Sequence, residues 1–231
     1  MIPTVLGGTR IRNNLGPFAT GMREDGAVAA DDPLHTSADG GDPFRSRLLD
    51  GLAASIEEKG YRETTVADIV RHARTSKRTF YDQFGNKDDC LLELLEIENA
   101  RMISDILSTV DPEGHWHAQV EQAVGSYVAT IESRPAIWLA WIREFPALGD
   151  RARPVQRRTM ERLTGMLMDL TTTPGFVRAD FEPVTRRLAL VLFGGLRELT
   201  ADTMERGEEI RSITETAVTA AAALVSRAHA R

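Results

Sequence analysis

The sequence predicts an all-α protein, in which an N-terminal three-helix domain is joined by a long helix to a helical bundle. Two observations predict this fold class. Apolar residues recur at three- and four-residue steps from Phe44 onward, without the two-residue alternation typical of β-strands. The periodic segments are also bounded by residues that favour helix ends, with Ser, Thr or Asn before them and Gly or Pro after them.

The length and composition are compatible with two globular domains. The chain has 231 residues, of which 42% are hydrophobic and 27% are charged. Residues 1–42 differ from the rest, because they are rich in Gly, Ala, Asp and Pro and show no sustained apolar periodicity. We therefore expect a mostly disordered extension over residues 1–42, a first domain over 43–91 and a second over 92–231.

Three helices are predicted in the first domain. The first begins near Phe44 and ends at Gly60, since glycine is the usual helix terminator. Thr65 is the predicted N-cap of a short second helix, and Ser76 is that of a short third helix. Phe80 and Phe84 lie one turn apart and mark its buried side. The apolar stripe of the first helix comprises Leu48, Leu49, Leu52, Ala53 and Ile56.

The second domain begins with a longer helix capped by Asn86. Its first turn holds Asp88 and Asp89, which are favourable near the positive end of a helix dipole. Because this helix starts in one domain and continues into the next, we expect it to connect them. Further helices are predicted over residues 116–131, 135–145, 150–172, 183–206 and 208–229.

A basic cluster lies between the second and third helices. The formal net charge of the chain is −6, so contact with a polyanion requires a locally basic surface. Such a surface is predicted because five basic residues fall within eight positions that hold no acid. Two short helices joined by a three- or four-residue turn form a helix-turn-helix, which lays its second helix in the DNA major groove. The five residues are Arg71, His72, Arg74, Lys77 and Arg78.

Individual side chains of the third helix suit contacts with bases. Arg78 and Thr79 project away from the phenylalanine side, and Lys77 and Gln83 flank them. Arg and Lys donate to guanine, Gln bonds adenine, and a Thr methyl contacts thymine. Contacts with the DNA backbone are predicted for Thr65, Ser76, Tyr81 and Lys87. Ordinary caps and an i,i+4 pair between Arg78 and Asp82 are the alternative interpretation.

Residues 47–91 resemble the DNA-binding domain of the TetR family of repressors. The resemblance implies Lys77, Arg78 and Thr79 near bases, with a weaker addition from Gln83. It also implies backbone contacts for the four residues assigned to them above. The residues that carry the resemblance are Gly60, Thr64, Thr65, Ile69, Ala73, Ser76, the run Thr79 to Tyr81, Phe84, Lys87 and Leu91.

The chain departs from the family pattern in the turn between the two short helices. Where the family usually has Gly and then Val before the serine, this chain has Arg74 and Thr75. The turn thus lacks its permissive glycine, and we expect a strained φ at Arg74. Both residues are included among the DNA-contact candidates, Arg74 through a phosphate.

For the second domain, the resemblance implies a variable helical regulatory region. Residues 137–142 are apolar almost all round, which favours a buried core helix. The alternative is that this region lines a pocket for a small apolar or aromatic effector. The candidate ligand-binding residues are Tyr127, Trp138, Trp141, Phe145, Met160 and Met166.

The last two helices are the predicted homodimer element. Apolar residues follow one side of each, and Gly194, Gly195 and the alanines at 220–223 permit close backbone approach. Packing within one chain is the alternative. The stripes comprise Val184, Leu188, Val191, Leu192, Leu196 and Leu199, then Ile210, Ile213, Ala217, Ala221 and Leu224.

The sequence gives no support for catalysis, a cofactor or a metal. It contains neither a nucleophile elbow nor a phosphate-binding loop, and His115 and His117 have no further ligand motif nearby. The single cysteine, Cys90, is either a buried structural residue or a redox sensor, and its acidic neighbours favour the former. A lone thiol, with no apolar run long enough to span a bilayer, predicts a cytoplasmic protein.

Together these observations predict a DNA-binding transcriptional regulator. The favoured hypothesis is a repressor that binds double-stranded DNA at a palindromic operator and is released by the small-molecule effector. An activator or a ligand-independent regulator is the first alternative. A helical carrier or enzyme with a non-functional helix-turn-helix is the second.

Overall fold

The computed structural model describes residues 42–227, and this part of the chain is helical without any β-strand. The predicted all-α class is confirmed. The predicted extension lies outside the described residues except for Asp42. The elements are α1 (Pro43–Glu63), α2 (Val66–His72), α3 (Lys77–Gln83), α4 (Lys87–Thr109), α5 (Trp116–Ser133), α6 (Pro135–Arg143), the 3-10 helix η1 (Phe145–Arg151), α7 (Arg153–Leu170), α8 (Pro174–Val177), α9 (Arg186–Glu205), the 3-10 helix η2 (Ile210–Ile213) and α10 (Thr214–Arg227).

Side-chain caps start three of the first four helices where the sequence predicts them. Thr65 accepts a hydrogen bond from the backbone N–H of Asp68, whose carboxylate accepts in return from the N–H of Thr65, completing a capping box. Ser76 and Asn86 cap α3 and α4 in the same way, each at 3.0 Å. These bonds satisfy N–H groups that a helix start leaves open, and so fix where α2, α3 and α4 begin.

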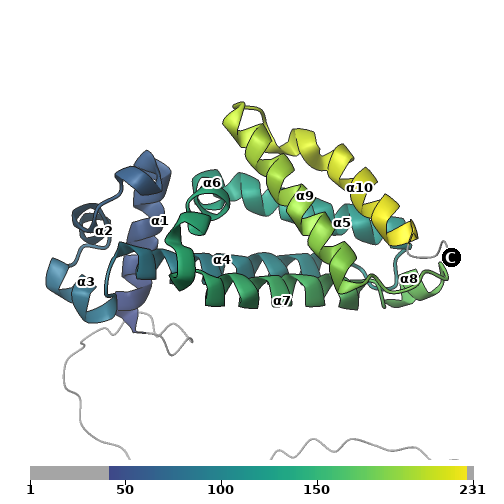
Figure 1. Cartoon of the computed structure of the whole chain (residues 1–231), viewed down its shortest axis with the longest axis horizontal. Helices are drawn as coiled ribbons and strands as arrows, with labels where there is room; N and C mark the ends of the chain where they lie inside the picture. The colour runs from purple at the N-terminus through teal and green to yellow at the C-terminus, as the bar shows by residue number, and fades with distance from the viewer. Residues whose placement is uncertain (1–41, 228–231) are drawn as a thin grey trace, which may run out of the picture. The chain divides into compact units, whose positions relative to one another are not determined.

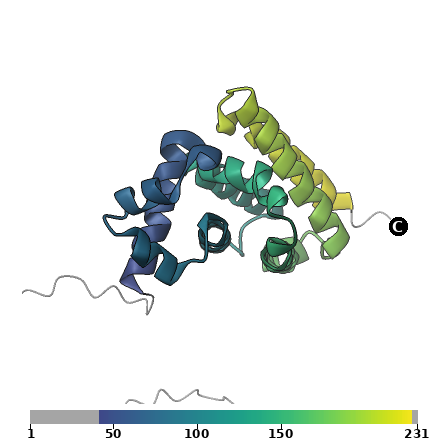
Figure 2. The same cartoon turned by 60° about the vertical axis from the view of Figure 1, so that its left-hand side comes forward.

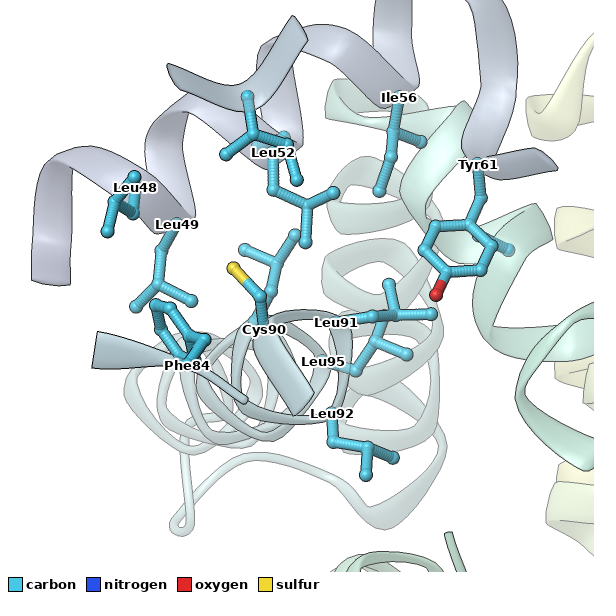
Figure 3. Close-up of a cluster of buried hydrophobic side chains, with 14 of the residues drawn as sticks. Leu48, Leu49, Leu52, Ile56, Tyr61, Phe84, Cys90, Leu91, Leu92 and Leu95 are labelled. Atoms are coloured by element: carbon cyan, nitrogen blue, oxygen red, sulfur yellow. The ribbon is translucent and has the colours of Figure 1, made fainter. Parts of the chain in front are cut away.

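The N-terminal core is formed by α1, which packs against α2, α3 and the start of α4. Leu48, Leu52 and Ile56 on α1 are fully buried, as is Phe80 on α3. Figure 3 shows the α1 side chains directed toward Phe84, Cys90 and the leucines of α4. Burial of these apolar side chains therefore holds α2, α3 and the start of α4 against α1 in one domain.

Gly51 permits the closest approach within this core. A Cβ atom at this position would lie 2.6 Å from the carbonyl oxygen of Ile69 and 3.0 Å from the amide nitrogen of Ala73. Both atoms belong to α2 or its C-cap, so a side chain at residue 51 would push α2 away from α1.

A second core lies inside a bundle of α4, α5, α7, α9 and α10. Helices α4 and α7 run side by side, and α9 and α10 form a pair on the side of the bundle away from α1–α3 (Figures 1 and 2). The buried residues include Val120, Val124 and Val128 on α5 and Leu192 and Leu196 on α9. Their recurrence every three or four residues is the periodicity on which the prediction of these helices rests.

Helix α6 lies between the two cores and belongs to both. Ile137 and Ala140 are buried in the N-terminal core, whereas Trp138 is buried in the core of the bundle. Trp141 packs against both. A displacement of α6 would therefore be felt in the N-terminal domain, because α6 packs directly on α1.

Ion pairs add to the connection between the two regions. Arg62 on α1 pairs with Glu144 at 2.8 Å, and Arg151 in η1 pairs with Asp89 on α4 at 2.9 Å. Arg45 on α1 pairs with Glu93 of α4 through its Nε and Nη2 atoms.

The structure differs from the predicted helix boundaries after residue 143. The chain leaves α6 at Arg143 and continues as η1, in which Pro146 stands in the first turn and Gly149 adopts a φ of 59°. Gly207, with a φ of 70°, separates α9 from η2. The predicted helix over 208–229 begins as η2 and continues as α10. The short helix α8 was not predicted, since four residues are too few to show periodicity.

Candidate DNA-binding surface and ligand cavities

The turn between α2 and α3 is closed by two backbone hydrogen bonds. The N–H of Thr75 donates to the carbonyl of Val70 at 3.0 Å, and that of Arg74 donates to Arg71 at 3.3 Å. This pair of bonds is the Schellman pattern, which requires a left-handed residue just after the helix. Arg74 occupies that position with a φ of 50°, so the strain predicted for it is confirmed.

The five basic residues of the predicted cluster divide into two groups. Arg71 and His72 both bind the carboxylate of Glu58, at 3.1 Å and 2.8 Å. Within residues 42–227, Arg74, Lys77 and Arg78 are exposed and have no ion-pair partner, and Arg78 does not pair with Asp82. The unpaired positive charge therefore lies in the loop between α2 and α3 and at the start of α3.

The surface of α3 carries further polar groups beside these cations. Thr79 is half-buried, and its hydroxyl lies 2.9 Å from that of Ser76. Tyr81 is 59% exposed, although its ring makes an edge contact with the buried ring of Phe80. Phe80 thus anchors α3 while Arg78, Thr79 and Tyr81 remain on its outer side.

Besides the capping residues Thr65 and Ser76, two of the predicted DNA contacts are engaged within the protein. The ammonium of Lys87 donates to the carbonyls of Tyr61 and Thr64 at 3.0 Å and 2.8 Å and lies 4.2 Å from the centre of the Tyr61 ring. Burial lowers the pKa of Lys87. Gln83 donates to Asp42 at 2.6 Å. Lys87 therefore holds the junction between α1 and α2, and Gln83 holds the start of α1.

Within the bundle, a cavity of about 70 Å³ lies between α4, α5, α7, α9 and α10. Its walls are apolar apart from Gln119, Tyr127 and Thr171. All three polar groups are hydrogen-bonded inside the protein: Tyr127 to Thr200 at 2.7 Å, Gln119 to Thr173 at 2.8 Å, and Thr171 to the carbonyl of Met168 at 2.9 Å. Burial raises the pKa of Tyr127, so its hydroxyl is un-ionised. The cavity thus suits an apolar group.

The structure brings five of the six ligand-binding candidates to cavities. Tyr127 and Met166 line the first cavity. Trp138, Trp141 and Met160 line a second cavity of about 50 Å³, which Tyr127 also borders. The two cavities share the wall residues Met102, Tyr127, Leu163, Phe193 and Leu196.

Phe145 is the exception, and its prediction as a cavity residue needs correction. It is buried in the N-terminal core and borders neither cavity, because α6 ends at Arg143 and Phe145 begins η1. Its ring centre lies 4.2 Å from that of Trp141, so the two rings are in contact.

Several cavity residues were missed from the sequence, among them Phe176 of α8 and Phe193 of α9. Helical periodicity shows that a residue is buried, but it does not show which buried residue faces an empty volume.

Only part of the predicted dimer element lies on the outer face of α9 and α10. Most of the predicted stripe is buried inside the chain, including Val184, Leu192 and Leu196, because α9 and α10 pack on α7 and α5. Val191 of the predicted stripe is 62% exposed, and Gly194 and Gly195, which the prediction also names, are exposed after it. On α10 the exposed positions include Ala220 and Ala223.

Cys90 and His115 have structural roles. Cys90 is fully buried, and burial raises the pKa of its thiol to about 12, which favours the structural interpretation. His115 caps α5. In residues 42–227 no group of three or more His, Cys, Asp or Glu side chains is placed to hold a metal ion. No helix in that range is long and apolar enough to cross a membrane.

Comparison with known proteins agrees with this geometry. Residues 48–94 match the family model described as bacterial regulatory proteins, tetR family. The HTH-type transcriptional regulator HbdR of Aromatoleum sp. (strain CIB) is 30% identical over 105 residues, which are 42% of this chain and 43% of HbdR. The chain spans less than half the length of the curated relatives it matches.

Solved structures share the fold over a larger part of the chain. The fatty acid degradation regulator FadR from Bacillus halodurans superposes with a TM-score of 0.65 at 18% identity, covering 81% of this chain and 97% of that one. FadR from Bacillus subtilis, solved in complex with stearoyl-CoA, gives a TM-score of 0.62 at 16% identity, covering 78% and 97%. At these identities the likeness concerns the fold.

The helix-turn-helix and its unpaired cations have the geometry of a DNA-binding domain, and a separate helical bundle follows it in the chain. Residues 48–94 therefore match the tetR family model, and most of the chain shares its fold with the solved FadR structures.

Proposed function

We propose that the protein is a dimeric repressor that binds a palindromic operator through α3 and leaves it when a small apolar ligand enters the bundle. The observation that carries this proposal is the placement of Arg74, Lys77 and Arg78. They are exposed and unpaired at the start of a recognition helix, in a chain with a formal charge of −6. A regulator that acts on chromosomal DNA would work in the cytoplasm.

The proposed roles of these residues follow from their positions. Lys77, Arg78 and Thr79 lie in the first turn of α3, the part of a recognition helix that contacts base edges. Arg74 and Tyr81, with Thr75 and the capped N-termini at Thr65 and Ser76, would contact phosphates. Lys87 and Gln83 would act mainly by holding the domain together.

A homodimer would place two copies of α3 on one face of the DNA. We propose the exposed side of α9 and α10 as the interface, because Val191, Gly194, Gly195, Ala220 and Ala223 offer an apolar surface with small residues. Small residues allow helices to approach closely and pack as a four-helix bundle. Two recognition helices about 34 Å apart would then read half-sites one DNA turn apart.

The size of the cavities suggests how a ligand would release DNA. The cavities, of about 70 and 50 Å³, are far smaller than the roughly 300–1,000 Å³ of most ligand sites. A ligand must therefore widen the bundle, and so favours a state in which its helices are displaced. Helices α4 and α6 border the cavities and pack on α1, so their displacement would reorient α3.

The nature of the ligand is proposed from the cavity walls, which are almost entirely apolar. The structurally similar FadR from Bacillus subtilis was solved with stearoyl-CoA, a molecule with a long apolar chain. A coupling of about 1–3 kcal/mol between ligand and DNA would weaken operator binding roughly 5- to 150-fold.

The DNA-binding part of the proposal is tested by gel shift on the region upstream of the protein's own gene. We expect saturable binding that weakens as salt is raised, because Lys and Arg displace counterions from phosphates. Arg78→Ala and Thr79→Ala should each weaken it, whereas Arg157→Ala, which removes an exposed arginine from α7, should not. Equal binding by all of these variants would exclude α3 as the reading element.

A further inference from the structure

Two residues that line the second cavity each carry a buried polar atom that the protein leaves without a partner. Asn99 on α4 and Trp138 on α6 both line it, and they are only 3% and 2% exposed. Within residues 42–227, the Asn99 Oδ1 atom and the Trp138 Nε1 atom are the buried side-chain nitrogen and oxygen atoms that make no hydrogen bond. Leaving such an atom unpaired costs about 1–3 kcal/mol, so two in one small cavity call for an explanation.

The orientation of the Asn99 amide is fixed by its other end. Its Nδ2 atom donates to the carbonyl of Leu95 at 2.7 Å, a contact that only the nitrogen can make. The oxygen is therefore the free end of the amide. The indole nitrogen of Trp138 is a donor only. The residues of the cavity wall thus supply one unpaired acceptor and one unpaired donor.

From this pair we infer a binding subsite for an uncharged hydroxyl group on an otherwise apolar ligand, with Trp138 donating to the hydroxyl oxygen and Asn99 accepting its proton. The inference rests on the proposed effector function and adds the polar group by which the effector is recognised.

The surroundings favour a neutral group over an anion. A carboxylate would lie against the Asn99 oxygen, which repels negative charge. The Asn99 oxygen would then still lack a hydrogen-bond donor, because an ionised carboxylate has none to offer. Arg197 is the one charged residue among those that line the cavity, and it is half-exposed on α9. The apolar part of the ligand would extend toward the first cavity, because both cavities share Met102, Tyr127 and Leu163 as walls.

Asn99 and Trp138 also lie on α4 and α6, the two helices whose displacement is proposed to release the protein from DNA. Asn99 follows Glu98, whose buried carboxylate pairs with Arg134 at the start of α6. Trp138 lies one turn further along α6, next to Ile137, which is buried against the N-terminal core. A hydroxyl held between Asn99 and Trp138 would join α4 to α6, the two helices that border the cavities and contact α1.

The test compares three probes of equal chain length, namely 1-octanol, 1-fluorooctane and octanoate, by isothermal titration calorimetry with the full chain. We expect 1-octanol to bind about tenfold more tightly than 1-fluorooctane, the combined effect of two hydrogen bonds. Asn99→Leu and Trp138→Phe should each reduce this ratio, and Ile131→Val, which alters the same wall without a polar atom, should preserve it.

A second measurement does not depend on the variants folding. In ¹⁵N-labelled wild-type protein, the indole N–H resonance of Trp138 should shift when 1-octanol is added and stay in place with 1-fluorooctane. Equal affinity for both probes, tighter binding of octanoate, or no binding of any probe would overturn the subsite. The gel shift without ligand is independent of these outcomes, so loss of the subsite and loss of the DNA-binding function are distinguishable.

Discussion

The two cores of this protein differ in how completely they are filled. Around α1, the side chains of Leu48, Leu52, Ile56 and Phe80 have no solvent exposure, and Gly51 brings α1 against the backbone of α2. The bundle core instead contains two cavities and the unpartnered atoms of Asn99 and Trp138. This difference agrees with the proposed roles, because the proposed DNA-reading domain must hold α3 rigidly, whereas the proposed sensor must be able to rearrange around a ligand.

The largest expected effect comes from adding a single methyl group to the tightly packed core. Gly51→Ala should destabilise the protein by about 1–3 kcal/mol, because the new Cβ would overlap the carbonyl of Ile69. Urea unfolding measures the change. Gly125→Ala on α5 is the control, since a Cβ there meets no atom within 4 Å, and it should stabilise by roughly 0.5–1 kcal/mol.

A smaller effect of opposite sign is expected in the turn of the helix-turn-helix. Arg74→Gly should stabilise the fold by about 1 kcal/mol, because glycine adopts a positive φ without strain. The same change should weaken DNA binding by removing a cation from the proposed interface. Arg74→Lys keeps both the charge and the strain, so a parallel loss of affinity in both variants would contradict a role for the charge.

The bundle should tolerate added volume that the N-terminal core does not. Val124→Ile places one more methylene in the wall of the first cavity, where it can be buried without displacing a neighbour. We expect a gain of up to about 0.8 kcal/mol in thermal or urea unfolding, together with weaker binding of apolar probes. Destabilisation comparable to that of Gly51→Ala would show that both cores are equally full.

The smallest effect concerns the ion pair that joins α4 to α7. Arg158 lowers the pKa of Glu96, with which it makes two hydrogen bonds of 2.9 and 3.1 Å. A depressed carboxylate stabilises the folded state above the ordinary Glu pKa, and this contribution is lost as the pH falls through the acidic range. Glu96→Gln should lower stability slightly at pH 7, by less than about 1 kcal/mol, and make no difference at low pH, so that the decline below about pH 5 becomes shallower.

The sequence was sufficient to predict the helix-turn-helix because its signals are local. Thr65, Ser76 and Asn86 cap helices within three residues, and the missing glycine at Arg74 correctly indicated a strained turn. The packing of distant segments was not predictable in this way. Lys87 is held by carbonyls of Tyr61 and Thr64, more than twenty residues earlier, which no short motif records.

The cavities of the bundle show the same limit. The aromatic segment around Trp138 correctly indicated buried residues, and five of the six candidates border cavities. Phe145 was assigned to the wrong neighbourhood because the end of α6 at Arg143 redirects the chain. The unpartnered atoms of Asn99 and Trp138 depend on which groups fail to meet in three dimensions, and sequence patterns do not report that.

The central claim is that α3 reads operator DNA. The most direct measurement is a DNase I footprint of the full chain on the DNA upstream of its own gene, at two salt concentrations. We predict protection of two half-sites whose centres lie about one helical turn apart, with protection reduced at higher salt and lost in the double variant Lys77→Ala, Arg78→Ala. Protection that is absent in the wild type, or unchanged in the double variant, would contradict the claim.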